Sequence, residues 1–451
     1  MIERSRAAFD RMFRPGEDGR LFYGWKIVAA GSITQLLVSG LFLQAYGAYV
    51  VLLHRDLGWS VTILSAGYSM ARTESAVLGP LQGHLVDRFG PRSVMRFGIV
   101  SFGLGFVILG MMQSLWHFFS AMVFLAVGSS FCGFVSVSSA VVNWFRRRRA
   151  TALGMSSIGF ALGGLVVPLT AAALTAFGWR AVAFGSGVGI LLMGPLLVQV
   201  IRQRPSDLGL FVDGIPPDLE ASDRGERRSD GDDENDAATP LDTDVDRNEP
   251  HEFTARQALK TPAFWQLSLG HGLAVVLVSA LIVHLIPFLT TELGYSLEAA
   301  GLVVAVLTLI QILGMVIGGM IGDRFDKRRI AVAAMIMHGS AALVLTVAVN
   351  PMLIGLFALL HGFAWGARGP LMQAWRADLF GSTSFGTILG YSSLIVMLGS
   401  ASGPLIAGML FDLLGSYRVS LQVLAGFAAI SLLMFSLVRP PPRPGAMPVM
   451  T

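Results

Sequence analysis

Three side chains that are charged at neutral pH lie inside long apolar stretches of the sequence: Arg72, Glu74 and Arg368. A charge at mid-bilayer costs at least ~2.5–3.5 kcal/mol, so such residues persist mainly where they face a polar cavity, a ligand or a partner. A guanidinium group can hold a carboxylate through two parallel hydrogen bonds. Two arginines against one glutamate therefore predict a net positive site for a small anion.

Each of these residues also has a structural interpretation. Arg72 and Glu74 are two positions apart, roughly 200° around a helix, so they should not face each other directly. Glu74 could carry a coupling proton, or both residues could belong to an ion-pair network between helices. Arg368 could bind substrate or extend toward the membrane surface. Gln311 and Tyr391 could donate hydrogen bonds to a substrate or serve only in packing.

Four histidines lie in the later apolar stretches. Histidine can exchange protons near neutral pH, so these residues could form a proton relay. The alternative is that each is a hydrogen-bonded interior side chain. The four residues are His271, His284, His338 and His361.

Composition sets the class of protein. Of the 451 residues, 53% are hydrophobic and 14% are charged, whereas soluble domains carry roughly 25% charged residues. A single cysteine, Cys132, excludes an internal disulfide and a cysteine-based metal site. We find no phosphate-binding Gly-Lys-Ser loop and no acidic or histidine cluster with metal-ligand spacing. We therefore expect no enzyme activity, no cofactor and no metal.

Apolar runs long enough to span roughly 30 Å of hydrocarbon as helices recur along the chain. Backbone groups in lipid must pair within their own segment, so the spans should be helices. The sequence predicts an all-α membrane protein with twelve spans at 26–50, 61–83, 94–114, 118–142, 154–176, 181–201, 263–290, 299–320, 330–349, 352–372, 387–411 and 419–438.

Basic residues fix the expected orientation. With an even number of spans, both termini lie on one side of the membrane. The loops on the other side contain only three basic residues, Arg55, Arg180 and Arg418. Basic loops stay in the cytoplasm, so we expect a multi-pass protein of the cell (inner) membrane with both termini cytoplasmic. The run Arg146–Arg149 then lies at the membrane surface, where it suits anionic lipid rather than nucleic acid.

The domain boundaries follow from these spans. Residues 1–25 and 439–451 are expected to be cytoplasmic tails, and 26–201 and 263–438 to be six-helix bundles. The acidic stretch 202–262 cannot bury a core, so we expect a largely disordered linker. A capping-box pattern near its end predicts a short helix at about 254–260.

The two predicted bundles are related by a repeat with a constant offset of 236 residues. Gly83 matches Gly319, and the segment that begins at Asp87 matches the one that begins at Asp323. Pro168 likewise matches Pro404. A repeat of this length indicates two pseudo-symmetric six-helix bundles that can rock around a site near the midplane.

The most specific motif lies in the loop after the second span and recurs after the eighth. This pattern resembles the G-x-x-x-D-R-x-G-R/K signature of the major facilitator superfamily, over essentially the whole chain. The resemblance implies the major facilitator fold and a gating role for the loop, in which Asp87 holds a neighbouring helix N-terminus. Asp326 replaces the second glycine in the later copy. The motif residues are Gly83, Asp87, Arg88, Gly90, Arg92, Gly319, Asp323, Arg324 and Arg328.

Further segments resemble the monocarboxylate and oxalate/formate antiporter branch of that superfamily. These segments are Tyr23–Trp25, Phe253–Trp265, Ser69–Ser75 and Gly366–Pro370. Better-known members use an arginine in the eighth helix to hold a carboxylate. The eighth span here has Thr308 and Gln311 as its polar residues instead, so the branch can be shared while the substrate differs.

These observations predict a secondary transporter of a small organic anion, a mono- or dicarboxylate, driven by proton symport or anion exchange. The expected partners are the anion, a proton or counter-anion and membrane lipids, without nucleic acid, and we expect a monomer. Two alternatives remain open: proton-coupled efflux of drugs or metabolites, and a transporter-like sensor that binds a ligand without moving it.

Overall fold

The computed structural model describes residues 22–146, 149–214, 253–322, 324–381 and 384–442, and every regular element in them is helical. The long elements are α2 (Tyr23–Val38), α3 (Tyr46–Leu57), α4 (Val61–Met111), α5 (Leu115–Phe131), α6 (Phe134–Trp144), α7 (Arg149–Val200), α10 (Pro262–Thr291), α11 (Leu297–Gly322), α12 (Lys327–Thr346), α13 (Pro351–Phe380), α14 (Phe385–Leu414) and α15 (Tyr417–Leu437). The short elements are the π-helical η1 (Ser39–Leu43), the 3₁₀ turns η2 (Pro205–Leu208) and η3 (Val212–Gly214), and α9 (Ala255–Leu259).

Ten segments of the described residues are long and apolar enough to cross a membrane. The number of spans, twelve, therefore remains a prediction. Two long helices bear on this difference, because α4 and α7 each contain a glycine with non-helical geometry: Gly90 at φ 78° and Gly178 at φ 77°. Each of these helices thus consists of two helical segments joined at a glycine. The conformation favours glycine because φ is positive.

The repeat-related position shows why Asp326 can replace the second motif glycine. Gly90 makes a sharp turn, and a Cβ atom there would lie 2.4 Å from the Gln203 side chain. Asp326 instead has φ −56°, and its carboxylate caps α12 by accepting a hydrogen bond from the backbone N–H of Arg328 at 2.8 Å. The two loops thus turn by different means.

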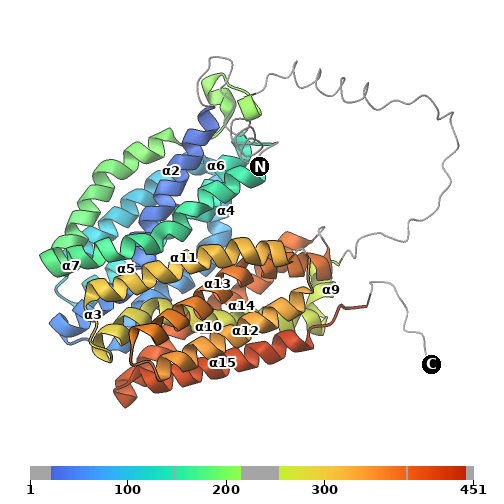
Figure 1. The fold of residues 1–451 in the computed structure, drawn as a ribbon. Coiled ribbons are helices and arrows are strands. Elements are labelled where there is room, and N and C mark those ends of the chain that lie inside the picture. The colour runs from blue at the N-terminus through green and yellow to red at the C-terminus, as the bar shows by residue number, and fades with distance from the viewer. Residues whose placement is uncertain (1–21, 147–148, 215–252, 323, 382–383, 443–451) are drawn as a thin grey trace, which may run out of the picture.

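The helices form two halves, α2–α7 and α10–α15, that lie beside each other (Figure 1). We call the end of the bundle where α2 begins and α15 ends the terminal end. The halves meet toward the other end, where α4 packs on α14, α7 on α11 and α3 on α10. A Cβ atom on Gly47 would lie 2.7 Å from the Val283 carbonyl oxygen, and one on Gly301 would lie 3.2 Å from Pro168. Small residues therefore bring the two halves into backbone contact away from the terminal end.

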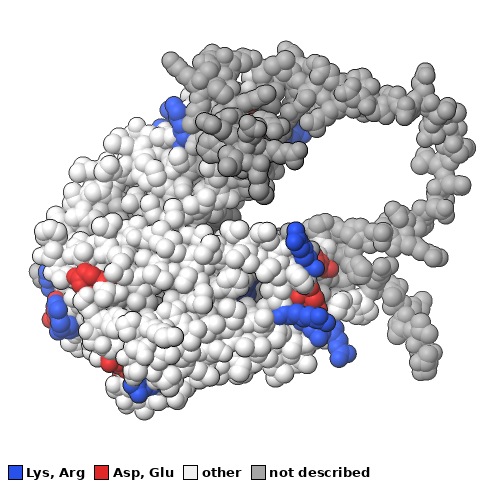
Figure 2. Space-filling model, in the orientation of Figure 1, with Lys and Arg blue, Asp and Glu red and all other residues white. Residues whose placement is uncertain are grey.

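The terminal ends of the same helices do not touch in the described part of the chain. A Cβ atom built on Gly83, Gly154, Gly319 or Gly390 would meet no atom within 4 Å. Figure 2 shows a hollow between the two halves at this end. A side chain at Gly83 would therefore meet no neighbouring helix of the described residues in this conformation.

The outer surface matches a membrane environment. On the face shown in Figure 2, the charged side chains gather at the two ends and leave a broad uncharged band between them. Large apolar side chains on long helices, such as Leu192 on α7 and Leu398 on α14, are more than two-thirds exposed. Their exposure is favourable in lipid, where it would be costly in water.

The predicted linker 202–262 is described only near its two ends. After residue 201 the chain forms η2 and η3, and before α10 it forms α9. Thr254 and Gln257 make both reciprocal bonds of a capping box at the start of α9. Residues 215–252, on which the expectation of disorder rests, lie outside the described residues.

Candidate functional site

Two arginines lie buried on α13, and the sequence interpretation recognised only one of them as a membrane residue. Arg368 and Arg376 are each 2% exposed. The predicted tenth span ended at residue 372, but α13 continues to Phe380 and carries Arg376 inside the bundle. Neither arginine takes part in an ion pair with any described acidic residue; the nearby Asp378 pairs instead with Lys327, at 2.7 Å. The C-terminal half thus holds two buried cations without an acidic partner in the described structure.

Arg376 is fixed by three neighbours. Its Nε donates to the Ser392 hydroxyl at 3.1 Å, and its Nη1 donates to the Met372 carbonyl at 3.1 Å. Its Nη2 lies 3.0 Å from Nδ1 of His271 on α10. A guanidinium nitrogen can only donate, so His271 accepts at Nδ1 and is neutral. A guanidinium carries five N–H groups, so two of them remain for a ligand.

Arg368 is less constrained. Its Nε and Nη1 atoms are buried and have no hydrogen-bond partner among the described residues. It lies within electrostatic range of Arg376 and of His271, His338 and His361. An unpaired buried donor loses its hydration without compensation, so Arg368 has hydrogen-bonding capacity that the protein itself does not use.

Glycines on α11 and α13 determine which way this face of α13 points. A Cβ atom on Gly366 would lie 1.9 Å from the Gln311 carbonyl oxygen, and one on Gly318 would lie 2.4 Å from Ala367. The backbones of α11 and α13 are therefore in direct contact along that side. Arg368, two positions after Gly366, therefore lies on the side of α13 away from this contact, and it interacts electrostatically with His271 of α10 and His338 of α12.

Arg72 and Glu74 lie in the other half and have separate surroundings. The Arg72 guanidinium lies 5.4 Å from the centre of the Tyr68 ring, and its Nε is buried without a partner among the described residues. Glu74 accepts a hydrogen bond from Ser130 on α5 at 3.2 Å. No ion pair joins Arg72 to Glu74 in the described structure, which agrees with their positions around the helix. The structure does not bring either residue into contact with Arg368.

The remaining predicted substrate ligands are not gathered at one point. Gln311 is half-buried on α11, where its backbone contacts Gly366. Tyr391 on α14 is 46% exposed. Both lie in the same half as Arg368, but neither has a described hydrogen bond to it. Their roles as substrate ligands remain predictions.

The first copy of the loop motif is only partly described. The side chain of Asp87, the predicted latch, lies outside the described residues. Arg88 is exposed and stacks over the Phe89 ring at 5.3 Å. Arg92 has a buried Nε without a described partner. Gly90 forms the turn between the two segments of α4.

In the second copy, Asp323 also lies outside the described residues. Gly319 faces open space, and Arg324 is exposed. Arg328 donates from Nη1 to the Val438 carbonyl at 3.5 Å, a long contact to the end of α15. The latch role of both aspartates therefore remains a prediction.

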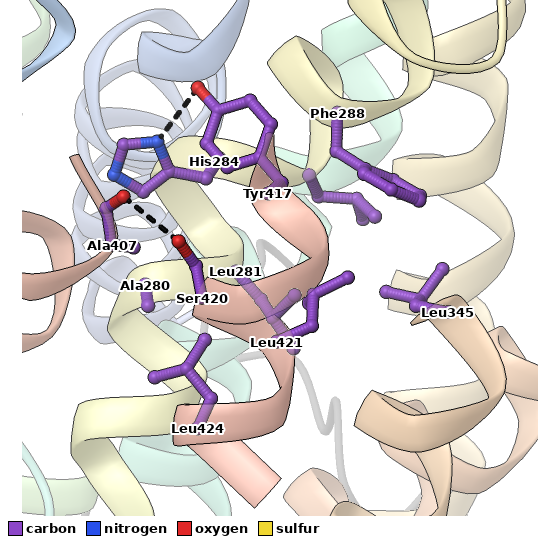
Figure 3. A pocket seen from close by; sticks show the side chains of 11 residues that line it. Ala280, Leu281, His284, Phe288, Leu345, Ala407, Tyr417, Ser420, Leu421 and Leu424 are labelled. Carbon is purple, nitrogen blue, oxygen red and sulfur yellow. Dashed lines mark hydrogen bonds between the residues drawn. The ribbon is translucent and has the colours of Figure 1, made fainter. Parts of the chain in front are cut away.

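His284 is a hydrogen-bonded interior residue (Figure 3). Its Nε2 lies 2.9 Å from the Pro404 carbonyl and must donate to it, which leaves Nδ1 to accept from the Tyr417 hydroxyl at 3.3 Å. Ser65 of the other half lies 3.2 Å from the same Nε2. The adjoining cavity holds only about 10 Å³ and is mainly apolar. This histidine therefore ties helices together and does not line a substrate cavity.

The signal that would have identified Arg376 is its helical phase. His361, Arg368, Met372 and Arg376 are spaced by seven, four and four residues, which places them near one face of a helix. Extending the span by two turns would have shown this polar face. Hydropathy alone ended the span too early, because the polar residues lowered it.

Comparison with known proteins extends these observations. The family model described as Major Facilitator Superfamily matches residues 33–285 and 267–448. Monocarboxylate transporter 13 of Bos taurus is 23% identical, and the alignment covers 90% of this chain and 87% of that protein. Membrane sensor protein UhpC of Salmonella typhimurium (strain LT2) is 24% identical, with 92% and 88% covered.

The fold is also found among solved structures. An inward-facing, unoccupied bacterial homologue of the human lysosomal transporter Spinster superposes with a TM-score of 0.68 at 17% identity. The match covers 92% of this chain and 97% of that one. At this identity the likeness shows the fold alone. Taken with the helical halves and the family match along most of its length, it shows that this chain belongs to the major facilitator superfamily.

Proposed function

We propose that this protein transports a small organic anion, a mono- or dicarboxylate, by alternating access, with Arg368 and Arg376 as its principal binding groups. The observation that carries the proposal is the pair of buried guanidinium groups without an acidic partner in the described structure. Burying an unpaired charge is strongly unfavourable. An anionic ligand between these groups would remove that cost, which a neutral or cationic substrate could not do.

The donor inventory supports the same assignment. Arg368 has Nε and Nη1 donors that no described residue uses; they lie on different edges of the guanidinium, and each can donate a charge-assisted hydrogen bond to a carboxylate oxygen. Arg376 is held rigid by Ser392 and His271, so it presents a fixed charge. Both groups are covered in this conformation, and the transport cycle must uncover them. Arg72 in the other half is the third cation available to the substrate.

The arrangement of the halves supports alternating access. They are joined away from the terminal end and separated at it. With both termini in the cytoplasm, as the basic loops predict, this conformation is open to the cytoplasm. The name of the monocarboxylate transporter relative is consistent with an anionic substrate. Proton symport and anion exchange are the two modes that this site permits.

The decisive experiment is transport in proteoliposomes that contain the purified full-length protein. Uptake of radiolabelled lactate and succinate is measured with the same anion inside and outside, together with a neutral solute of similar size. We expect exchange of at least one anion, reduced at least about tenfold in Arg368→Gln, since a lost charge-assisted bond contributes ~1.5–3 kcal/mol. Arg55→Gln, at an exposed position outside the bundle core, is the matched control. Exchange that survives in both Arg368→Gln and Arg376→Gln would contradict the site.

A ligand sensor is the second candidate, because one relative is named a membrane sensor protein. A sensor would bind the anion without moving it. Binding of the same radiolabelled anions to protein in detergent, measured beside the uptake assay, separates the two functions. Saturable binding that Arg368→Gln removes, with no uptake by wild type, would favour the sensor.

A further inference from the structure

Two buried histidines face each other beside Arg368. Nδ1 of His338 on α12 and Nδ1 of His361 on α13 are 3.1 Å apart, and the side chains are 0% and 1% exposed. In this contact one nitrogen must carry a hydrogen and the other a lone pair. Two neutral imidazoles therefore share one N–H between them, and an additional proton must enter at an outer Nε2 atom.

The pair has one member at the junction of the halves and one in the interior. His361 lines a cavity of about 20 Å³ between the halves, together with Gln44 of the N-terminal half and Trp365. A volume of this size can hold a water molecule. Nε2 of His338 is buried and has no partner among the described residues. When Nδ1 of His361 donates the shared hydrogen, Nε2 of His338 already carries a hydrogen, and a proton that enters at Nε2 of His361 can be passed inward to Nδ1 of His338.

Arg368 is the fixed charge that acts on both rings. On α13, Arg376 and Asp378 lie beyond it, and α10 contributes the neutral His271 and, further along the helix, His284. The other packed helices bring their titratable groups only near their ends. These are Lys327, Arg328 and Arg329 on α12, Glu298 on α11, Tyr417 and Arg418 on α15, and Tyr391 and Asp412 on α14.

We propose that the His338–His361 pair binds the co-transported proton, and that it does so when a substrate anion occupies Arg368. This inference rests on the proposed function and assigns its coupling to proton symport. The guanidinium repels a second positive charge on the neighbouring rings, and repulsion is strong where water is excluded. A carboxylate on Arg368 cancels that charge, so anion and proton stabilise each other. Reciprocity follows, because each ligand must raise the affinity for the other by the same factor.

The proposal differs from the expectation that Glu74 carries the proton. Glu74 lies in the N-terminal half, bonded to Ser130 on α5. It has no contact with Arg368 in the described structure. A proton there would not respond directly to an anion in the C-terminal half. His361, in contrast, is on the same face of α13 as Arg368, and it contacts His338 of α12 directly.

The test compares two transport modes in the same proteoliposomes. Exchange with equal anion on both sides needs no net proton movement, whereas accumulation against a gradient does. The probe is whichever of radiolabelled lactate or succinate the wild type exchanges. An inward gradient of one pH unit, with the membrane potential clamped at zero, supports about tenfold accumulation for one proton per anion. The variants are His361→Gln, His338→Gln and Glu74→Gln, with His117→Gln near the start of α5 as the matched control.

At saturating anion, we expect His361→Gln and His338→Gln to keep exchange within about threefold of wild type and to lose the pH-driven accumulation. Glu74→Gln and His117→Gln should keep both. Accumulation that both histidine variants retain would overturn the proposal. Loss of exchange in both variants would also overturn it, because it would indicate a structural role for the histidines. Wild-type exchange without any pH-driven accumulation would overturn it while leaving the proposed function intact. If the wild type exchanges neither anion, the proposed function and this inference fall together.

Discussion

The carboxylate of Asp412 joins the two halves at the end where they are closed. Asp412, near the end of α14, accepts hydrogen bonds from the backbone N–H groups of Val61 and Thr62 at 3.1 and 2.7 Å. It also accepts from the Thr62 hydroxyl at 2.5 Å. These donors form the first turn of α4, where the helix dipole favours a negative charge. We predict that Asp412→Asn weakens this closure.

The size of the effect follows from the contacts. Asparagine keeps one acceptor oxygen and loses the charge, so at least one charge-assisted bond is lost. Such bonds contribute ~1.5–3 kcal/mol, and the exposed position of Asp412 argues for the lower limit. A loss of about 1.5 kcal/mol changes the ratio of closed to open conformers roughly tenfold.

The assay is a distance measurement by double electron–electron resonance between spin labels on opposite halves. The labels are placed at Gln113→Cys and Val349→Cys, both exposed at the closed end, in a Cys132→Ala background. The longer distance should gain about tenfold in population relative to the shorter one in Asp412→Asn.

A matched control tests whether neutralising any carboxylate at this end has the same effect on the distance. Asp56 accepts from Trp179 of its own half at 3.1 Å and does not bridge the halves. Asp56→Asn should therefore leave the distance distribution unchanged. An unchanged distribution in Asp412→Asn, or an equal change in both variants, would refute the reasoning.

Three further predictions concern the motif loop and the topology. Gly90→Ala should destabilise the protein by roughly 2–3 kcal/mol, because alanine strains at φ 78° and its Cβ would collide with Gln203; a melting temperature equal to that of wild type would count against the turn. Asp87→Asn should insert normally in the membrane but slow transport, since an amide holds helix-terminal N–H groups less well than a carboxylate; full transport at equal expression would remove the latch role. Asn235→Cys should react with a membrane-impermeant maleimide only in broken cells, and labelling of intact cells would reverse the predicted orientation.

The helical class and the pairing of the halves could be read from the sequence. Long apolar runs force helices, because hydrocarbon offers the backbone no hydrogen bonds. The constant offset that relates Gly83 to Gly319 requires two similar halves. These conclusions depend on local composition and periodicity, which a linear sequence contains. The family resemblance could be read for the same reason.

Hydropathy does not locate the ends of a span accurately, because it is averaged over a window of residues. The polar face of α13 lowered the average after residue 372 and hid Arg376, although the helix continues to Phe380. Helical phase, which relates His361 to Arg368 and Arg376, would have corrected this.

Tertiary structure alone decided which polar residues meet. His338 and His361 are 23 positions apart on different helices, and the sequence gives no reason to pair them over His271 or His284. The close contact of α11 and α13 at Gly366 leaves Arg368 on the side of α13 away from α11. Packing between helices fixes such contacts, and they depend on the shapes of all the neighbouring side chains at once. Spacing within one segment therefore predicts a face, while only the assembled bundle determines what that face meets.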